Sequence, residues 1–285
     1  MRNFYIILTF FLAALSVGCA NINSHDYRDK ADSAEESTKL GDKALLLGQF
    51  DEALSNYVSV LNQNPNNYEI LYKIGLIHIE KANIDLAQEA FLMALKFAPN
   101  HAKTLESLGL LQLERRNYIN AVKNLNAAVK IDSKLWRAYN GLGLFADLQH
   151  DYPSAITSYT NALENSSASI DVLNNRGYSK YLSGDWQGAE QDYKAVLKIN
   201  VKFDLTLNNL ALLQARQGKE KQALQTFQQS TDASSSCNNV GYIYMLDGNY
   251  SNAERLFIQS IAMSPTYNVK AQKNLVRLYE IWKKR

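Results

Sequence analysis

Residues 170–199 read IDVLNNRGYSKYLSGDWQGAEQDYKAVLKI, and the spacing of three residues within this stretch is copied along the chain. Gly177 is followed by Ala189 after 12 residues and by Tyr193 after 16. The glycine recurs every 34 residues, at Gly41, Gly75, Gly109, Gly143 and Gly177. The alanine keeps the same step, at Ala53, Ala87, Ala121, Ala155, Ala189 and Ala223. A fixed period of this length indicates one supersecondary unit that is repeated and that buries its apolar face on its neighbours.

Each unit is expected to hold two amphipathic helices joined by a short turn. A glycine closes the first helix at Gly48, Gly184, Gly218 and Gly248, where a left-handed residue is useful. Proline ends the second helix at Pro65, Pro99 and Pro265. With the aromatic residue that follows the alanine, this pattern resembles the tetratricopeptide repeat (TPR) family over residues 34–267.

The TPR resemblance implies an all-α fold, a right-handed α-solenoid of about seven TPR helix pairs with a C-terminal capping helix. The units are expected to begin near Ala34, Tyr68, Ala102, Trp136, Ile170, Asp204 and Ser234. Residues 268–285 would form the capping helix, in which Leu275, Leu278 and Trp282 cover the exposed end of the stack.

One step of the repeat is short. Ala211, which stands at the glycine position of the sixth unit, is 30 residues before Gly241. Ala223 is likewise 30 residues before Ala253. Because four residues make about one helical turn, their loss keeps the apolar face nearly in phase. We therefore expect a shortened second helix in the sixth unit. The shortening is interpreted as a tolerated deletion, and the alternative is a bend that separates the last unit from the rest.

The N-terminus is predicted to be a lipoprotein signal peptide over residues 1–18. Arg2 is followed by an apolar run from Phe4 to Leu15, which is too short to span a bilayer comfortably. The run ends in LSVGC, which resembles the bacterial lipobox and implies a lipid on Cys19. The alternative is an ordinary secretory signal with an incidental cysteine. Residues 19–33, which are Cys19 and the polar residues that follow it, are predicted to form a tether.

The composition argues against nucleic-acid binding and catalysis. The formal net charge is only +2, and the sequence holds no phosphate loop, dinucleotide fingerprint or nucleophile elbow. The four histidines include no pair at the three- or four-residue spacing of metal ligands on one helix face. We therefore predict no enzymatic activity, no cofactor and no metal site. Cys237 occupies a repeat position that is leucine in other units and is predicted to be buried.

The TPR resemblance also implies a binding groove, because in TPR arrays the fifth, ninth and twelfth residues of the first helices face the concave side. The fifth position carries a ladder of amides, Asn140, Asn174, Asn208 and Asn238. Such amides can pair with an extended peptide backbone. Tyr178 and Tyr242 at the ninth position and Tyr181 at the twelfth are the expected aromatic anchors. An alternative interpretation is that the asparagines bond neighbouring helices and that the apolar residues pack across the superhelix.

A narrower resemblance covers roughly residues 130–280, which are similar to the TPR lipoproteins of the tight adherence (Tad/Flp) pilus-assembly machinery, the TadD type. It rests on successive phrases such as WRAYNGLGLFADL and TLNNLALLQARQG. It implies a lipoprotein of the bacterial outer membrane that faces the periplasm and binds the pilus secretin or other pilus-assembly components. Two alternatives stay open: a pilotin of another type IV pilus or secretion system, and an adaptor that recruits peptidoglycan hydrolases.

Overall fold

The computed structural model describes residues 24–166, 169–263 and 269–284 of the 285-residue chain. Within these ranges the chain forms fifteen helices, α2 to α16, and no strand. The fold class predicted from the repeat, all-α with paired helices, is confirmed. The chain divides into two compact units, Met1–Pro99 and Asn100–Arg285. Each unit is considered by itself.

The first unit contains two helix pairs. They are α2 (Ser24–Leu46) with α3 (Phe50–Gln63), and α4 (Tyr68–Glu80) with α5 (Ile84–Phe97). Each pair packs internally, and α3 packs on α4. Because α2 begins at Ser24, the last ten residues of the segment predicted as a tether are helical. Cys19 and the signal peptide lie outside the described residues.

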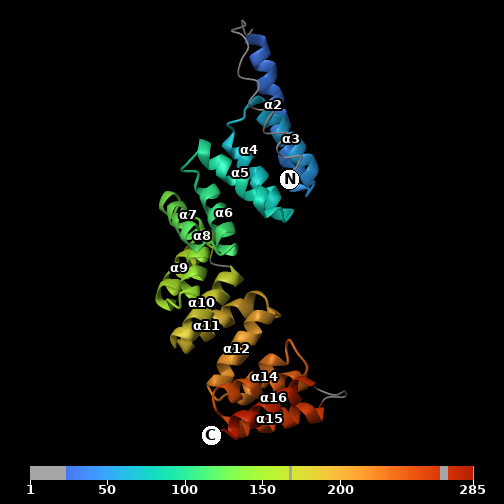
Figure 1. Cartoon of the computed structure of the whole chain (residues 1–285), viewed down its shortest axis with the longest axis vertical. Helices are drawn as coiled ribbons and strands as arrows, with labels where there is room; N and C mark the ends of the chain where they lie inside the picture. Colours follow the sequence, from blue (N-terminus) through green and yellow to red (C-terminus); the bar gives the residue numbers. More distant parts are fainter. Residues whose placement is uncertain (1–23, 167–168, 264–268, 285) are drawn as a thin grey trace. The chain divides into compact units, whose positions relative to one another are not determined.

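The second unit holds five helix pairs and a last single helix. The pairs are α6 (Ala102–Glu114) with α7 (Tyr118–Ile131), α8 (Trp136–Leu148) with α9 (Tyr152–Asn165), α10 (Ile170–Ser183) with α11 (Trp186–Ile199), α12 (Asp204–Arg216) with α13 (Glu220–Phe227), and α14 (Ala233–Leu246) with α15 (Tyr250–Met263). The chain ends in α16 (Val269–Trp282). First helices also pack on first helices, α6 on α8, α8 on α10, α10 on α12 and α12 on α14 (Figure 1).

The repeated glycine exists because the two helices of a pair cross closely at this position. A Cβ atom placed on Gly177 would lie 2.7 Å from the ring of Tyr193, the aromatic residue 16 positions later. At Gly143 the distance to the Tyr159 ring would be 2.5 Å. Both rings are fully buried, so they have little room to retreat. The glycine and the aromatic residue of the sequence period are therefore the two sides of one contact.

The turn between the helices of a pair uses a left-handed residue in every unit. Glycine occupies this position four times, at Gly48, Gly184, Gly218 and Gly248, with φ between 71° and 91°. The other three units place Ala82, Arg116 and His150 there, with φ between 55° and 60°. The predicted glycine turns are confirmed, and these three turns carry the strain of a left-handed residue with a side chain.

The sixth unit is short where the sequence predicts it. Its second helix α13 has 8 residues, whereas α11 and α15 have 14 each. The hydrophobic core nevertheless crosses the joint, because Ala223 and Phe227 belong to the same buried cluster as Val240 and Phe257. The predicted burial of Cys237 within this cluster is also confirmed. The shortening has therefore been absorbed without dividing the core.

The last helix closes the stack as the sequence predicts. Leu278 is fully buried in the core cluster of the last units, and Leu275 packs against it. The third predicted residue, Trp282, lies at the edge, with its ring 5.8 Å from that of Tyr250 and 37% of its surface exposed. Within the described part of the chain, no helix combines the length and the apolar character needed to span a membrane.

Candidate functional site

All the predicted binding residues lie on first helices of the second unit, α8, α10, α12 and α14. Asn174 on α10 is 3% exposed. Its Oδ1 atom accepts hydrogen bonds from Thr206 Oγ1 at 2.8 Å and from Asn209 Nδ2 at 3.1 Å, both on α12. The side chain thus joins two neighbouring first helices.

Two other members of the predicted ladder make the same kind of bond. Asn175 Nδ2 donates to Asn140 Oδ1 at 3.3 Å, and Asn274 Nδ2 on α16 donates to Asn238 Oδ1 at 2.9 Å. The sixth-position asparagine of one unit, or its counterpart on α16, therefore bonds the fifth-position asparagine of the preceding unit. For Asn140, Asn174 and Asn238 the geometry matches the interpretation that they bond neighbouring helices.

Asn208 differs from the other three. Its side chain is exposed and makes no hydrogen bond to any described residue. It lies at the joint where the repeat is 30 rather than 34 residues long, between α12 and α14. A pocket of about 410 Å³ opens here. Its lining is Asn208, Asn209, Leu212, Phe227, Asn238, Asn239, Tyr242, Ile243, Lys270 and Asn274.

The three predicted aromatic anchors lie in two different parts of the second unit. Tyr242 lines the pocket. Tyr178 and Tyr181 lie on α10 with their rings stacked at 6.0 Å, and only Tyr178 is well exposed, at 40%. Tyr181 is buried, its pKa is raised by that burial, and its ring lies 5.5 Å below the guanidinium of Arg216. Tyr181 is therefore a packing residue beneath the exposed Tyr178.

An apolar stripe, defined by five exposed side chains, lies on three of these first helices, α8, α10 and α14. Its members are Leu144, Leu148, Tyr178, Leu182 and Leu246, each at least 37% exposed. The ninth position of the repeat identified Tyr178 from the sequence, but the leucines one helical turn later were missed. These leucines could have been found from the sequence, because each stands at position 13 of its unit, in units four, five and seven. Exposed apolar residues gathered on one face are typical of an interaction surface.

Below this face, two homologous tyrosines have different partners. Tyr159 OH donates to Asp147 Oδ2 at 2.8 Å, and Ser179 Oγ donates to the same carboxylate at 2.7 Å. Burial raises the pKa of Asp147. In the next unit the position of Asp147 is taken by Tyr181, and the buried hydroxyl of Tyr193 has no partner among the described residues.

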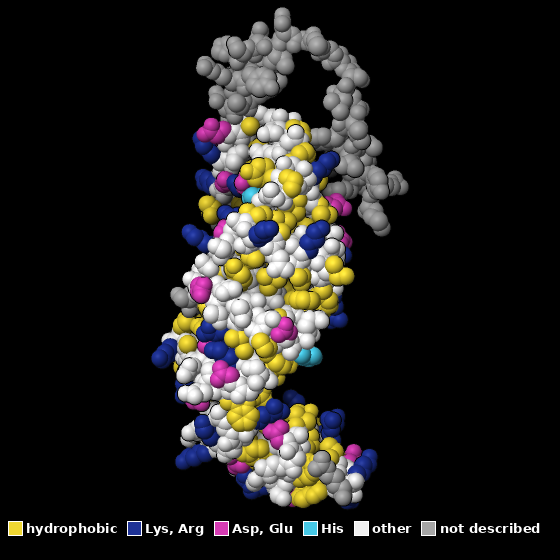
Figure 2. All heavy atoms as spheres, turned by 90° about the vertical axis from the view of Figure 1, so that its left-hand side faces the viewer, with side chains coloured by type: hydrophobic (Ala, Val, Ile, Leu, Met, Phe, Trp, Pro, Cys, Tyr) yellow, Lys and Arg dark blue, Asp and Glu magenta, His cyan; other side chains and the backbone are white. Residues whose placement is uncertain are grey.

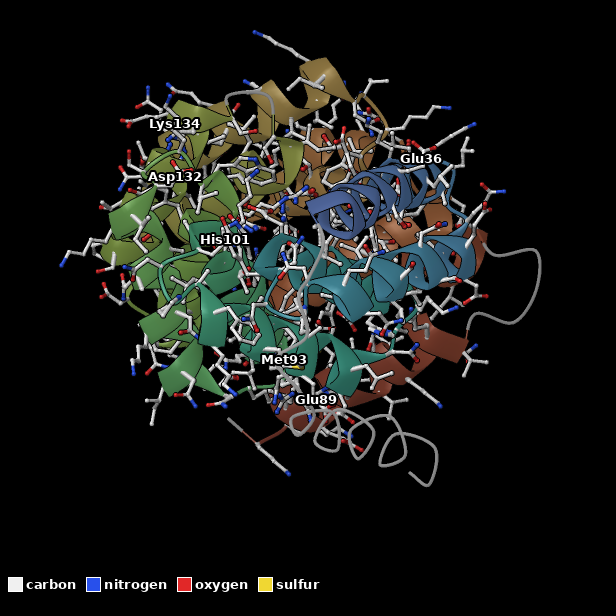
Figure 3. All side chains as sticks on the ribbon, turned by 90° about the horizontal axis from the view of Figure 1, so that it is seen from above. Glu36, Glu89, Met93, His101, Asp132 and Lys134 are labelled. Carbon is white, nitrogen blue, oxygen red and sulfur yellow. The ribbon has the colours of Figure 1, made fainter. Side chains whose placement is uncertain are left out.

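Ionisable side chains elsewhere are spread over the surface or paired. On the face shown in Figure 2, Lys and Arg are scattered together with Asp and Glu. In the view from above, Asp132 and Lys134 lie beside each other in the turn before α8, where the Lys134 amide donates to Asp132 Oδ1 at 2.9 Å (Figure 3). Among the side chains that the structure describes, no group of three or more His, Cys, Asp or Glu is placed to hold a metal ion.

Comparison with known families and structures was consistent with this architecture. Three family models, each described as a tetratricopeptide repeat, match residues 44–108, 107–170 and 234–264. None of the curated protein sequences compared with the chain matches it significantly.

Solved structures of similar fold cover most of the chain. A tetratricopeptide repeat protein from Parabacteroides merdae is 18% identical, with a TM-score of 0.58 over 87% of this chain and 99% of its own. The C-terminal part of a TPR repeat-containing protein from Cytophaga hutchinsonii is also 18% identical, with a TM-score of 0.60 over 83% and 98%. PilF of Pseudomonas aeruginosa is 15% identical, with a TM-score of 0.55 over 90% and 100%. At these identities the likeness is one of fold.

Proposed function

Because the chain belongs to the tetratricopeptide repeat proteins, we propose that it is a non-enzymatic scaffold that binds protein partners on the first-helix face of α8, α10, α12 and α14. The observation that carries this proposal is the apolar stripe beside the amide-lined pocket. Repeat arrays bury apolar residues between units, so the leucine and tyrosine side chains left exposed on α8, α10 and α14 are available for a partner.

The finer proposal places this scaffold in pilus assembly. It is a lipoprotein held through Cys19 at the outer membrane, faces the periplasm and binds the secretin or another component of a Tad/Flp-type apparatus. The support is the lipobox-like sequence before Cys19 and the similarity of residues 130–280 to TadD-type lipoproteins. The fold shared with PilF is compatible with this role but adds no separate argument for it.

The binding proposal is tested by capture of partners from the native cells. The full-length protein, solubilised in detergent, is compared with a variant that carries Leu148→Ala, Tyr178→Ala and Leu182→Ala. Wild-type protein should retain a secretin or other pilus component identified by mass spectrometry. The stripe variant should lose it, because the substitutions remove the exposed tyrosine anchor and the apolar area around it.

A matched control keeps this experiment specific. Ile119→Ala removes an apolar side chain that is 86% exposed on α7, outside the stripe, and should leave capture unchanged. Equal capture by wild type and stripe variant would place the binding surface elsewhere. Recovery of peptidoglycan hydrolases without pilus proteins would replace the pilus proposal with the adaptor.

The membrane anchor has a test of its own. Cys19→Ala should shift the protein from the membrane to the soluble fraction of fractionated cells, because the residue that carries the lipid is gone. Protein that stays with the membrane after this substitution would rule out lipidation at Cys19 as the anchor.

A further inference from the structure

The short sixth unit changes the hydrogen bonds of the amides that line the pocket. At the joint of α10 and α12, 34 residues apart, Asn209 and Thr206 saturate the carbonyl of Asn174. At the joint of α12 and α14, 30 residues apart, Asn208 is exposed instead. Asn239, which corresponds to Asn209, accepts only a 3.5 Å contact from its neighbour Asn238. Both side chains line the pocket.

The pocket combines three kinds of chemistry. Five asparagines provide amide donors and acceptors, and Leu212, Phe227 and Ile243 provide an apolar lining. Lys270 on α16 is the one charged residue of the lining, which contains no Asp or Glu. Its side chain is exposed and takes part in no ion pair with the described residues. An ammonium beside unpaired amide groups is suited to a carboxylate held by charge-assisted hydrogen bonds.

We propose that this pocket binds an extended segment of a partner protein that carries one acidic side chain, with the carboxylate on Lys270 and the backbone on Asn208 and Asn239. An adjacent apolar side chain of the segment occupies the surface of Leu212, Phe227 and Ile243. The proposal rests on the proposed scaffold function and names the class of ligand for one part of its binding face.

The exposed position of Lys270 suits a carboxylate on a side chain of the bound segment. Lys270 is exposed, so it lies at the rim of the pocket, where a chain that crosses the opening can present a side-chain carboxylate without ending there. The asparagines pair with peptide groups of any sequence, so the lysine and the apolar lining are the elements that select.

The test is a selection of random peptides, displayed inside a surface loop of a carrier protein so that no free carboxyl terminus is present. The full-length detergent-solubilised protein is compared with Lys270→Glu. Peptides enriched on wild type should share an Asp or Glu next to an apolar residue, and peptides enriched on Lys270→Glu should carry Lys or Arg at that place. The most enriched acidic peptide, measured by fluorescence anisotropy, should bind Lys270→Glu at least about tenfold more weakly than wild type.

The outcomes separate this inference from the proposed function. Lys283→Glu, in the turn that follows α16 and outside the pocket lining, should keep the acidic preference and serves as the control for net charge. Enrichment without an acidic residue, or the same peptides on Lys270→Glu, would overturn the inference and leave the scaffold standing. A selection that enriches no peptide on wild type would count against both.

Discussion

The joint between α10 and α12 and the joint between α12 and α14 carry the same Asn-Asn pair at the same repeat positions but use it differently. At the first joint Asn174 is buried and bonded to the next helix. At the second, four residues shorter, Asn208 is exposed in a pocket. A change in the length of one second helix thus turns a structural amide into one that is free to bind. The spacing of the units, rather than residue identity, decides which role an asparagine has.

The largest expected effect comes from restoring the regular spacing. Insertion of four alanines between Gln228 and Gln229 should lengthen α13 by about one turn and let Asn239 reach Asn208, as Asn209 reaches Asn174. The pocket should close, and the acidic peptide from the selection should no longer bind while the helix content measured by circular dichroism is kept. Replacing Gln228 and Gln229 by alanine without insertion is the control. Unchanged peptide affinity in the insertion variant would separate the pocket from the short step.

The two asparagines should differ in their contribution to stability. Asn174→Ala leaves the hydroxyl of the buried Thr206 without its acceptor and should lower the free energy of unfolding by about 2–3 kcal/mol. Asn208→Ala should change it by less than about 0.5 kcal/mol, because the side chain is exposed. Denaturant unfolding of both variants checks this. Equal losses would show that the short joint depends on its amide as much as the regular one.

A further comparison concerns the buried tyrosine hydroxyls of two regular units, one with a hydrogen-bond partner and one without. Tyr159→Phe removes the hydroxyl that donates to the half-buried Asp147 and should destabilise the fold by about 2 kcal/mol. Tyr193→Phe removes a buried hydroxyl that has no partner in the described structure, and should leave stability unchanged or raise it by up to about 1 kcal/mol. Thermal unfolding distinguishes the two variants. Destabilisation by Tyr193→Phe would indicate that this hydroxyl does have a partner.

The turns of the fifth and sixth units test where the sixth unit departs from the others. Gly184→Ala and Gly218→Ala each place a side chain on a left-handed residue and should each cost about 1 kcal/mol, in the regular fifth unit and the short sixth unit alike. Equal losses of unfolding free energy for the two variants, measured by denaturant unfolding, would show that the sixth unit differs from the fifth only at the end of α13. A clearly smaller cost for Gly218→Ala would show that the turn before α13 has relaxed as well. Arg116→Gly, which relieves the same strain, should stabilise the fold and is the control of opposite sign.

Much of the fold could be predicted because the repeated contacts are local in sequence. Gly177 and Tyr193 lie 16 residues apart in one helix pair, so their spacing reports the contact directly. The start of α2 at Ser24 was missed because residues 20–33 show no apolar period, although polar residues can continue a helix. The candidate site was harder, since Asn140, Asn174, Asn208 and Asn238 are the same residue at the same position and nothing local distinguishes them.

The sequence by itself determined that this chain is built of helix pairs, where four of the pairs turn on a glycine, and that the sixth unit is short. Those features follow from steric contacts and backbone conformations within a single unit. Only the tertiary structure decided that Asn174 is a bond between helices, that Tyr181 is buried beneath Tyr178, and that Asn208 and Lys270 share a pocket. These outcomes depend on how one unit packs on the next, where a shift of one helical turn changes which polar groups meet and which remain open to a partner.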